Sequence, residues 1–183
     1  MWRRGSRSDQ DRVRVVKDVE RSRERTMNRA VKLLAAKPRS IGELRERLLE
    51  KLWTDEAIVD RVIEKLKEYK YLDDEQYARE LAVSKLRQKP QGKRRLQQTM
   101  SQKKLDKETV QSAITNAFET MPETDLIDLA IAKRVRLRGR PETREDTKKL
   151  YDHLLRQGFS FDLIREKVAG LAREHFDDDG VSI

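Results

Sequence analysis

The sequence predicts an all-α protein in which three tandem three-helix, helix-turn-helix-like repeats form an elongated array that can be curved. Composition is the first reason, because 41% of the residues are charged, with both signs mixed, and the chain has 7 Gly and 4 Pro. Such a composition favours solvated amphipathic helices over disorder. The second reason is one pattern of apolar residues that occurs three times. Units of this size bury little surface alone, so neighbouring repeats are expected to stack.

The repeated pattern is clearest in the segment 41–66. Leu44 and Leu48 lie one helical turn apart and predict one helix. A stripe at every fourth residue from Ile58 to Leu66 predicts a second amphipathic helix. Matching positions follow without gaps in the two later units, at Leu96, Met100, Val110, Ile114 and Phe118, and at Leu150, Leu154, Ile164, Val168 and Ala172.

Between the paired helices of each unit stands an apolar residue followed by a polar one. The pairs are Trp53-Thr54, Leu105-Asp106 and Phe159-Ser160. The polar residue of each pair is a good N-cap, and the apolar residue before it can pack on the helix as a hydrophobic staple. We therefore expect these apolar residues to lie in the core.

A further helix is expected before each pair. In unit one its inward residues are Met27, Ala30, Val31 and Leu34. In unit two it begins at Asp74, with Tyr77, Ala78, Leu81 and Ala82 inward. In unit three it begins at Thr124 or Asp125, with Leu126, Leu129 and Ala130 inward. The predicted organisation is an N-terminal basic arm at 1–25, repeats at 26–72, 73–119 and 120–172, and an acidic tail at 173–183.

The charge balance points to an acidic partner. The net charge is +9 and the pI is about 9.8, which suits nucleic acid or an acidic protein surface, although charge also simply keeps a protein soluble. With no Cys, disulfides and thiolate sites are excluded. The sequence shows no signal peptide and no apolar run long enough for a membrane span. We expect a cytoplasmic monomer that does not bind membranes.

One segment, Leu81 to Leu105, has no acidic residue at all. Because a solvated helix normally mixes signs, this bias predicts a face that binds an anion. Gly92 begins a predicted helix here, and its free backbone N–H groups are expected to add to the anion site. The candidate binding residues are Lys85, Arg87, Lys89, Lys93, Arg94, Arg95, Lys103 and Lys104.

A second basic stretch closes the first helix of the third unit. It is a candidate contact surface, but cations are also favoured at a helix C-terminus by the helix dipole. Its residues are Lys133, Arg134, Arg136, Arg138 and Arg140. The termini are expected to be solvated tails, the arm with Arg3, Arg4, Arg7, Arg12 and Arg14 and the tail with Asp177, Asp178 and Asp179.

Nothing in the sequence favours catalysis. The two histidines, His153 and His175, lack the spacing of a metal site or a catalytic triad. The acidic run 73–75 is typical of a helix start rather than a metal site. No Gly-rich nucleotide loop is present. We expect a non-enzymatic protein without a cofactor.

Four segments in order resemble the RecX family over roughly residues 26–172. They are AVKLLAAKPRSIGELRERLLEK, YLDDEQYAREL, KPQGKRRLQQTMSQKKLDKETV and LYDHLLRQGFSFDLIREKV. The chain departs from the family at Lys104 and Leu52, which stand where members commonly have the turn glycine found here as Gly158. The resemblance implies a protein of DNA repair, recombination and the SOS response that binds the RecA filament on single-stranded DNA. Members typically inhibit strand exchange, ATP hydrolysis and co-protease function.

Two other functions remain open. A direct DNA-binding helix-turn-helix regulator would suit paired helices, but the second helix of each pair starts with acidic residues, which repel phosphate. An RNA-associated scaffold is disfavoured by the aromatic content of 5%, because stacking platforms need aromatic residues.

Overall fold

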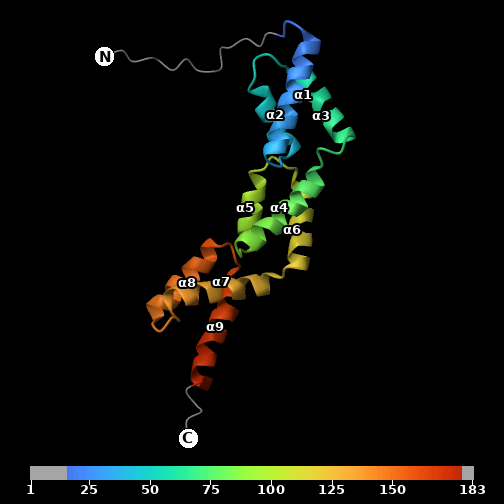
Figure 1. Ribbon diagram of the computed structural model, residues 1–183. Helices are drawn as coiled ribbons and strands as arrows, with labels where there is room; N and C mark the ends of the chain where they lie inside the picture. The colour runs from blue at the N-terminus through green and yellow to red at the C-terminus, as the bar shows by residue number, and fades with distance from the viewer. Residues whose placement is uncertain (1–15, 179–183) are drawn as a thin grey trace, which may run out of the picture. The chain divides into compact units, whose positions relative to one another are not determined.

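The computed structural model describes residues 16–178, with side chains described for 16–171, and all regular structure in this range is helical. This part of the chain contains nine α-helices (Figure 1). They are α1 (Val19–Ala36), α2 (Ile41–Leu49), α3 (Glu56–Glu68), α4 (Asp74–Gln88), α5 (Lys93–Ser101), α6 (Lys107–Thr120), α7 (Glu123–Arg138), α8 (Arg144–Arg156) and α9 (Phe161–Asp178). The prediction of an all-α protein with three tandem three-helix repeats is confirmed.

The helices at the two ends of the described range extend into the predicted arm and tail. The first helix begins at Val19, within the predicted arm 1–25, with Asp18 accepting a hydrogen bond from the Arg21 backbone. The last helix continues to Asp178, which includes part of the predicted acidic tail. The basic residues of the arm at positions 3–14, and Asp179, lie outside the described residues.

The helices group into two compact units that divide after Asp74. In the first unit, α1, α2 and α3 pack on one another around a core of its own. The buried apolar residues of this core are Ala30, Leu44, Leu48, Val59, Val62, Ile63, Leu66 and Leu72. Val31 is 49% exposed, so the inward face of α1 is narrower than predicted.

In the first unit α2 begins with a capping box, and the cap of α3 differs from the predicted one. Ser40 and Glu43 form a capping box at the start of α2, which satisfies two free donors. The cap of α3 is Asp55, whose carboxylate accepts the Ile58 N–H at 2.8 Å. Thr54, which was predicted as the cap, is instead buried, with its hydroxyl bonded to that of Thr26 at 3.0 Å. A carboxylate accepts a backbone N–H more strongly than a hydroxyl does, so Asp55 rather than Thr54 caps the helix. The Thr54 hydroxyl is bonded to Thr26 of α1 instead.

The predicted caps of the two later repeats are confirmed. Asp106 accepts the Thr109 N–H at 2.8 Å, and Ser160 accepts the Leu163 N–H at 3.4 Å. Hydrogen bonds from Thr109 hold the pKa of the Asp106 carboxyl below its usual value. The turn before Asp106 passes through Lys104 with φ 54°, and Gly158 occupies the equivalent left-handed position with φ 88°. Leu52 has no positive φ, so the turn of the first repeat is built differently.

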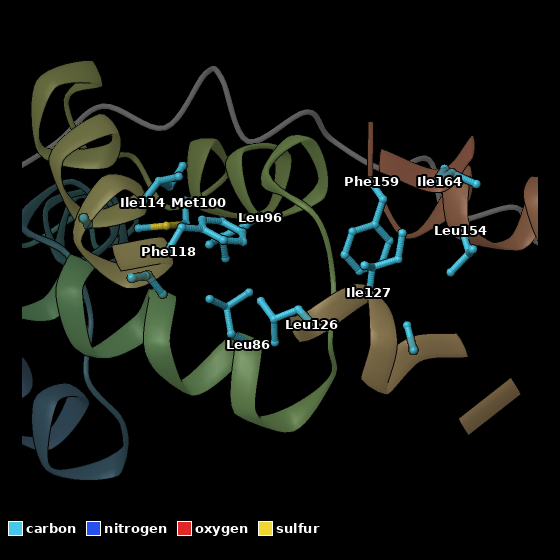
Figure 2. Close-up of a cluster of buried hydrophobic side chains, with 14 of the residues drawn as sticks. Leu86, Leu96, Met100, Ile114, Phe118, Leu126, Ile127, Leu154, Phe159 and Ile164 are labelled. Atoms are coloured by element: carbon cyan, nitrogen blue, oxygen red, sulfur yellow. The ribbon is translucent and has the colours of Figure 1, made fainter. Parts of the chain in front are cut away.

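Repeats 2 and 3 share one core in the second unit, drawn from α4 to α9. Leu86, Leu96 and Phe118 lie on one side of this core, and Phe159 and Leu154 lie on the other (Figure 2). Helix α7 supplies both parts, since Leu126 lies on the side of Leu86 and Ile127 on the side of Phe159 and Leu154 in Figure 2. The matched apolar positions of these repeats that the structure describes are buried, apart from half-buried Leu105.

The inward face of α7 differs from the prediction at one position. Leu126 and Ala130 are buried as expected, but Leu129 is 56% exposed. Ile127 and Ile131 are buried in its place, because α7 also packs on α8 and α9. A helix that faces two neighbours buries a wider strip than one stripe at helical spacing predicts.

Candidate binding surface

The second unit contains a group of cations that have no acidic partner in the described residues. In unit 1 several surface cations are paired: Arg45 binds Asp60 at 2.9 Å, Arg47 binds Glu50 at 2.6 Å and Lys67 binds Glu64 at 3.0 Å. By contrast, Lys85, Arg87, Lys89 and Arg94 form no ion pair within the described part of the chain. Each exposed pair contributes little to stability, but an unmatched group of cations raises the local potential toward an anion.

Two of the backbone N–H groups expected to form the anion site at Gly92 are used inside the protein. The Gly92 N–H donates to the Gln157 carbonyl at 3.0 Å, and the Lys93 N–H donates to the Glu123 carboxylate at 2.9 Å. Gly92 itself is buried against Gly158, so closely that a Cβ there would lie 2.2 Å from the Gly158 carbonyl oxygen. The start of α5 is therefore filled by repeat 3, and the helix dipole is offset by a carboxylate of the protein.

The three cations that follow Gly92 have separate roles. The Arg95 guanidinium donates to the Arg156 carbonyl at 2.7 Å and so covers the end of α8. The Lys93 ammonium lies 5.6 Å from the Phe118 ring centroid, within range of a cation–π contact. Arg94 is exposed and has no such contact in the described residues. Of the three, Arg94 is the one free to bind a partner without loss of internal contacts.

The eight candidate residues of the acid-free segment lie at different places along α4 and α5. Lys103 and Lys104 lie in the turn after α5, at the opposite end of that helix from Gly92. A helix of nine residues is about 13 Å long. Lys85 on α4 and Lys89, which follows the end of this helix, lie one helical turn apart, while Arg87 lies on another side of α4. The segment supplies at least two separate groups of cations.

The second predicted patch divides between two sides of α7. Arg134, Arg138 and Arg140 line a surface pocket of about 400 Å³, which Lys149 also lines and to which Glu142 and Asp146 contribute acidic groups. Lys133 and Arg136 lie outside it and are exposed, as are Leu129 and Leu137. None of the five cations of this patch has an ion pair in the described range.

The side chain of His153 is influenced by cations from both predicted patches. Its half-buried side chain lies where burial, and then the charges of Arg134, Arg156 and Lys89, lower the pKa of the imidazole below its usual value. Lys89 belongs to the first predicted patch and Arg134 to the second. The sequence does not indicate these roles of His153 and Arg156, because nothing in their spacing on α8 shows that cations from α7 and from the residue after α4 come close.

The described residues offer no candidate metal site and no candidate membrane-spanning helix. The residues that the structure describes contain no group of acidic or histidine side chains that could hold a metal ion. None of the described helices is long and apolar enough to cross a membrane.

Three family models match the chain in sequence order. The model of the first three-helix domain of RecX matches residues 27–66, that of the second matches 73–114 and that of the third matches 123–168. The matches begin and end inside the three structural repeats. The order of domains is therefore that of the family.

Curated relatives agree with the domain models. The regulatory protein RecX of Prosthecochloris aestuarii is 31% identical over 142 residues, which cover 78% of this chain and 90% of that protein. The regulatory protein RecX of Chlorobium limicola is 33% identical over 143 residues, covering 78% and 86%. The chain spans 65% of the length of the Clostridium botulinum (strain Alaska E43) relative, to which it is 29% identical.

Two crystal structures have the same fold. RecX from Lactobacillus salivarius superposes with a TM-score of 0.73 at 20% identity, covering 84% of this chain and 98% of that one. A second structure, titled regulatory protein RecX, gives a TM-score of 0.66 at 23% identity, covering 80% and 71%. With the domain models in order and relatives above 30% identity matched over most of both chains, this chain belongs to the RecX family.

Proposed function

We propose that this protein is a non-enzymatic regulator that binds the RecA filament on single-stranded DNA and inhibits its recombination, ATPase and co-protease activities. Family membership supports a regulatory role. The observation that supports a particular binding surface is the concentration of unpaired cations on α4, α5 and α7 of the second unit. A filament of protein on nucleic acid offers a long acidic surface, which such cations attract.

The test is a titration of RecA ATPase on single-stranded DNA with this protein. We expect inhibition by the wild-type chain. A variant with Lys85→Gln, Arg87→Gln and Arg94→Gln removes three cations that have no partner in the described residues, and it should need at least ten times more protein for the same inhibition. Unaltered inhibition by this variant would remove the α4–α5 cations from the proposal.

A matched variant controls for net charge. Arg45→Gln, Arg47→Gln and Lys67→Gln also removes three positive charges, but each of these side chains is paired with a carboxylate in unit 1. This control should inhibit ATPase within about twofold of the wild type. If wild-type protein has no effect on RecA at all, the proposed function is wrong.

Direct reading of duplex DNA by a recognition helix is the second candidate. The caps of α3 and α6 argue against it, because Asp55 and Asp106 already accept the N–H groups that would meet phosphate. A binding assay with duplex DNA in the absence of RecA distinguishes the two candidates. Tight binding to one duplex sequence over others would favour the helix-turn-helix regulator.

We also propose that the protein acts in the cytoplasm as a monomer and without a cofactor. The expected partners are RecA and, through phosphate contacts, single-stranded DNA. Light scattering after size exclusion would check the monomer directly.

A further inference from the structure

The outer face of α7 combines exposed apolar side chains with unpaired cations. Leu129 is 56% exposed and Leu137 is 65% exposed, although the opposite side of the same helix lies in the core of the second unit. Lys133 and Arg136 stand between them in sequence, are exposed, and have no ion pair in the described residues. We propose that these four residues form a docking surface for an acidic amphipathic helix of a partner protein.

Helical spacing places the four side chains on one side of α7. Leu129, Lys133 and Leu137 follow one another at every fourth residue and form a ridge, and Arg136 lies beside its end. The two leucines are about 12 Å apart along the axis, because each residue rises about 1.5 Å. The sides of α7 that face the core carry Leu126 and Ile127 instead (Figure 2). The exposed fractions of Leu129 and Leu137 show that no described helix covers the ridge.

The charge of this ridge is positive along its whole length. Residues 129–140 include five Lys or Arg residues and no Asp or Glu. Asp125 lies one turn before Leu129, and Asp128 is bound to Lys167 of α9 at 2.5 Å, so neither stands between the two leucines. Unmatched cations attract an acidic partner and orient its approach.

The carboxylates of the α7–α8 connection belong to a different side of α7. Glu142 and Asp146 line the pocket that contains Arg134, Arg138 and Arg140. Lys133 and Arg136 do not line this pocket. The acidic groups that are available to one side of α7 therefore leave the ridge without a counter-charge in the described residues.

The leucines select a protein as the partner. A phosphodiester backbone pairs with cations, but it gains nothing from two exposed leucines. A second copy of this chain, docked through the same face, would bring Lys133 and Arg136 against identical cations, and like charges repel. An acidic amphipathic helix satisfies both features, because its apolar stripe covers Leu129 and Leu137 while its carboxylates pair with the cations.

This surface rests on the proposed function only for the source of the helix, which is the RecA protein of the filament rather than its DNA. The chemistry of the surface does not depend on RecA. It can therefore be tested with a designed peptide first and with the filament afterwards.

The first experiment measures the binding of a fluorescent peptide to the full chain by anisotropy. The peptide is an acidic helix of about four turns, with leucines along one side and glutamates along the other sides. A scrambled peptide of the same composition spreads the leucines around the helix. We expect the amphipathic peptide to bind at least about tenfold more tightly than the scrambled one, because burial of a single leucine can supply that factor.

Two double variants separate the apolar and the charged contributions. Leu129→Gln/Leu137→Gln should weaken binding of the amphipathic peptide at least about tenfold at every salt concentration, because the lost contact is apolar. Lys133→Gln/Arg136→Gln should weaken it about fivefold at low salt and much less at high salt, because salt screens exposed ion pairs.

Matched controls remove similar side chains elsewhere. Val19→Gln/Val31→Gln removes two exposed aliphatic residues of α1. Arg144→Gln/Lys148→Gln removes two exposed cations of α8 that have no ion pair in the described range. Both controls should bind the amphipathic peptide within about twofold of the wild type, because neither changes α7.

The second experiment identifies what contacts the ridge in the filament. The chain has no cysteine, so Ala132→Cys provides a unique exposed thiol one turn before Arg136, to which a benzophenone cross-linker is attached. With RecA on single-stranded DNA, we expect cross-links to a helix of RecA that has acidic and apolar residues at helical spacing. Leu129→Gln/Leu137→Gln should also raise the concentration needed to inhibit RecA ATPase.

Several results would overturn the docking surface. They are equal binding of the two peptides, unaltered peptide binding by Leu129→Gln/Leu137→Gln, and cross-links to the oligonucleotide or to a second copy of the chain instead of RecA. Leucine-dependent binding to anionic phospholipid vesicles that is tighter than peptide binding would assign the ridge to a membrane and would also overturn it.

The surface and the proposed function can fail separately. If Leu129→Gln/Leu137→Gln inhibits RecA ATPase as well as the wild type does, the docking surface is wrong and the regulatory function stands. If the peptide binds as expected but the wild-type chain has no effect on RecA, the proposed function is wrong and the surface serves another acidic protein.

Discussion

At the scale of single residues, the backbone at some helix ends is left-handed, and a residue with a Cβ is strained there. Helix α3 ends with Lys70 at φ 57°. The Lys70 N–H donates to the Lys67 carbonyl and the Tyr71 N–H to the Leu66 carbonyl, both at 2.9 Å, which is the Schellman pattern. Gly158 ends α8 in the same pattern, with no Cβ to strain.

Lys70→Gly is therefore expected to stabilise the protein by about 0.5 to 1 kcal/mol, because a left-handed residue with a Cβ is strained by more than glycine loses in chain entropy. The measurement is the urea midpoint at an unchanged m-value. Lys70→Ala keeps the Cβ and should shift the midpoint little. Equal midpoints for the Gly and Ala variants would contradict the strain.

Protonation of His153 is expected to make the free energy of unfolding depend on pH. Burial, followed by Arg134, Arg156 and Lys89, lowers its pKa in the folded state, so the unfolded chain binds this proton more readily. The stability is fully present above the unfolded pKa of about 6.5 and is lost as the pH falls from there through the folded pKa. His153→Gln should remove this part of the difference between urea midpoints at pH 8 and pH 5. An unchanged difference would mean that the imidazole is not perturbed.

At the scale of elements, two glycines set how closely α5 approaches the turn between α8 and α9. A Cβ on Gly92 would meet the Gly158 carbonyl oxygen at 2.2 Å, and a Cβ on Gly158 would meet the Arg95 backbone nitrogen at 2.5 Å. Both obstacles are backbone, which cannot move aside as the end of a flexible side chain can. The contact fixes repeat 2 against repeat 3.

Gly92→Ala is expected to destabilise the protein by about 2 to 3 kcal/mol, because the helix and the turn must separate. Gly170 provides the matched control, since it lies within α9 and a Cβ there meets nothing within 4 Å. Gly170→Ala should stabilise by up to about 1 kcal/mol through helix propensity. Urea unfolding measures both, and a neutral Gly92→Ala would contradict the close contact.

At the scale of the whole molecule, the three repeats form two cores. Repeat 1 has its own, while repeats 2 and 3 bury their apolar residues together. Leu154 of repeat 3 therefore belongs to the same core as Leu96 and Met100 of repeat 2. A loss of packing in either of these repeats is expected to spread to the other.

Hydrogen exchange tests this sharing of a core. Leu154→Ala should cost about 2 to 5 kcal/mol as a cavity in a buried core, and it should speed amide exchange in α5 and α6 as well as in α7–α9. Leu44→Ala, equally buried but in repeat 1, should raise exchange in α1–α3. Exchange confined to α7–α9 in Leu154→Ala would show that repeats 2 and 3 unfold independently.

Much of the fold could be predicted from local patterns. The stripe from Ile58 to Leu66 and the described positions of its two counterparts are buried, and Asp106 and Ser160 cap the helices predicted for them. These features depend on spacing along one helix, which the sequence states directly. The α3 cap was misassigned by one residue, because Thr54 and Asp55 are adjacent and either side chain can accept the N–H bond.

The candidate site could be predicted only in part. The absence of acidic residues around α5 located unpaired cations at Lys85, Arg87, Lys89 and Arg94. Lys93 and Arg95 make contacts inside the protein, and residues of repeat 3 accept the N–H groups at the start of α5. These contacts depend on how repeat 3 packs on repeat 2, which no local sequence pattern indicates. The same holds for His153, which meets cations from three places in the chain.

The sequence by itself determined the helices, their caps and the threefold repeat, because these follow from the periodicity of apolar residues and from short-range hydrogen bonds. The tertiary structure decided that repeats 2 and 3 share a core. It also decided which cations are used inside the protein and which have no ion pair in the described residues. The physical reason is that a charge acts over several ångströms of space, and its neighbours in space are set by packing rather than by order along the chain.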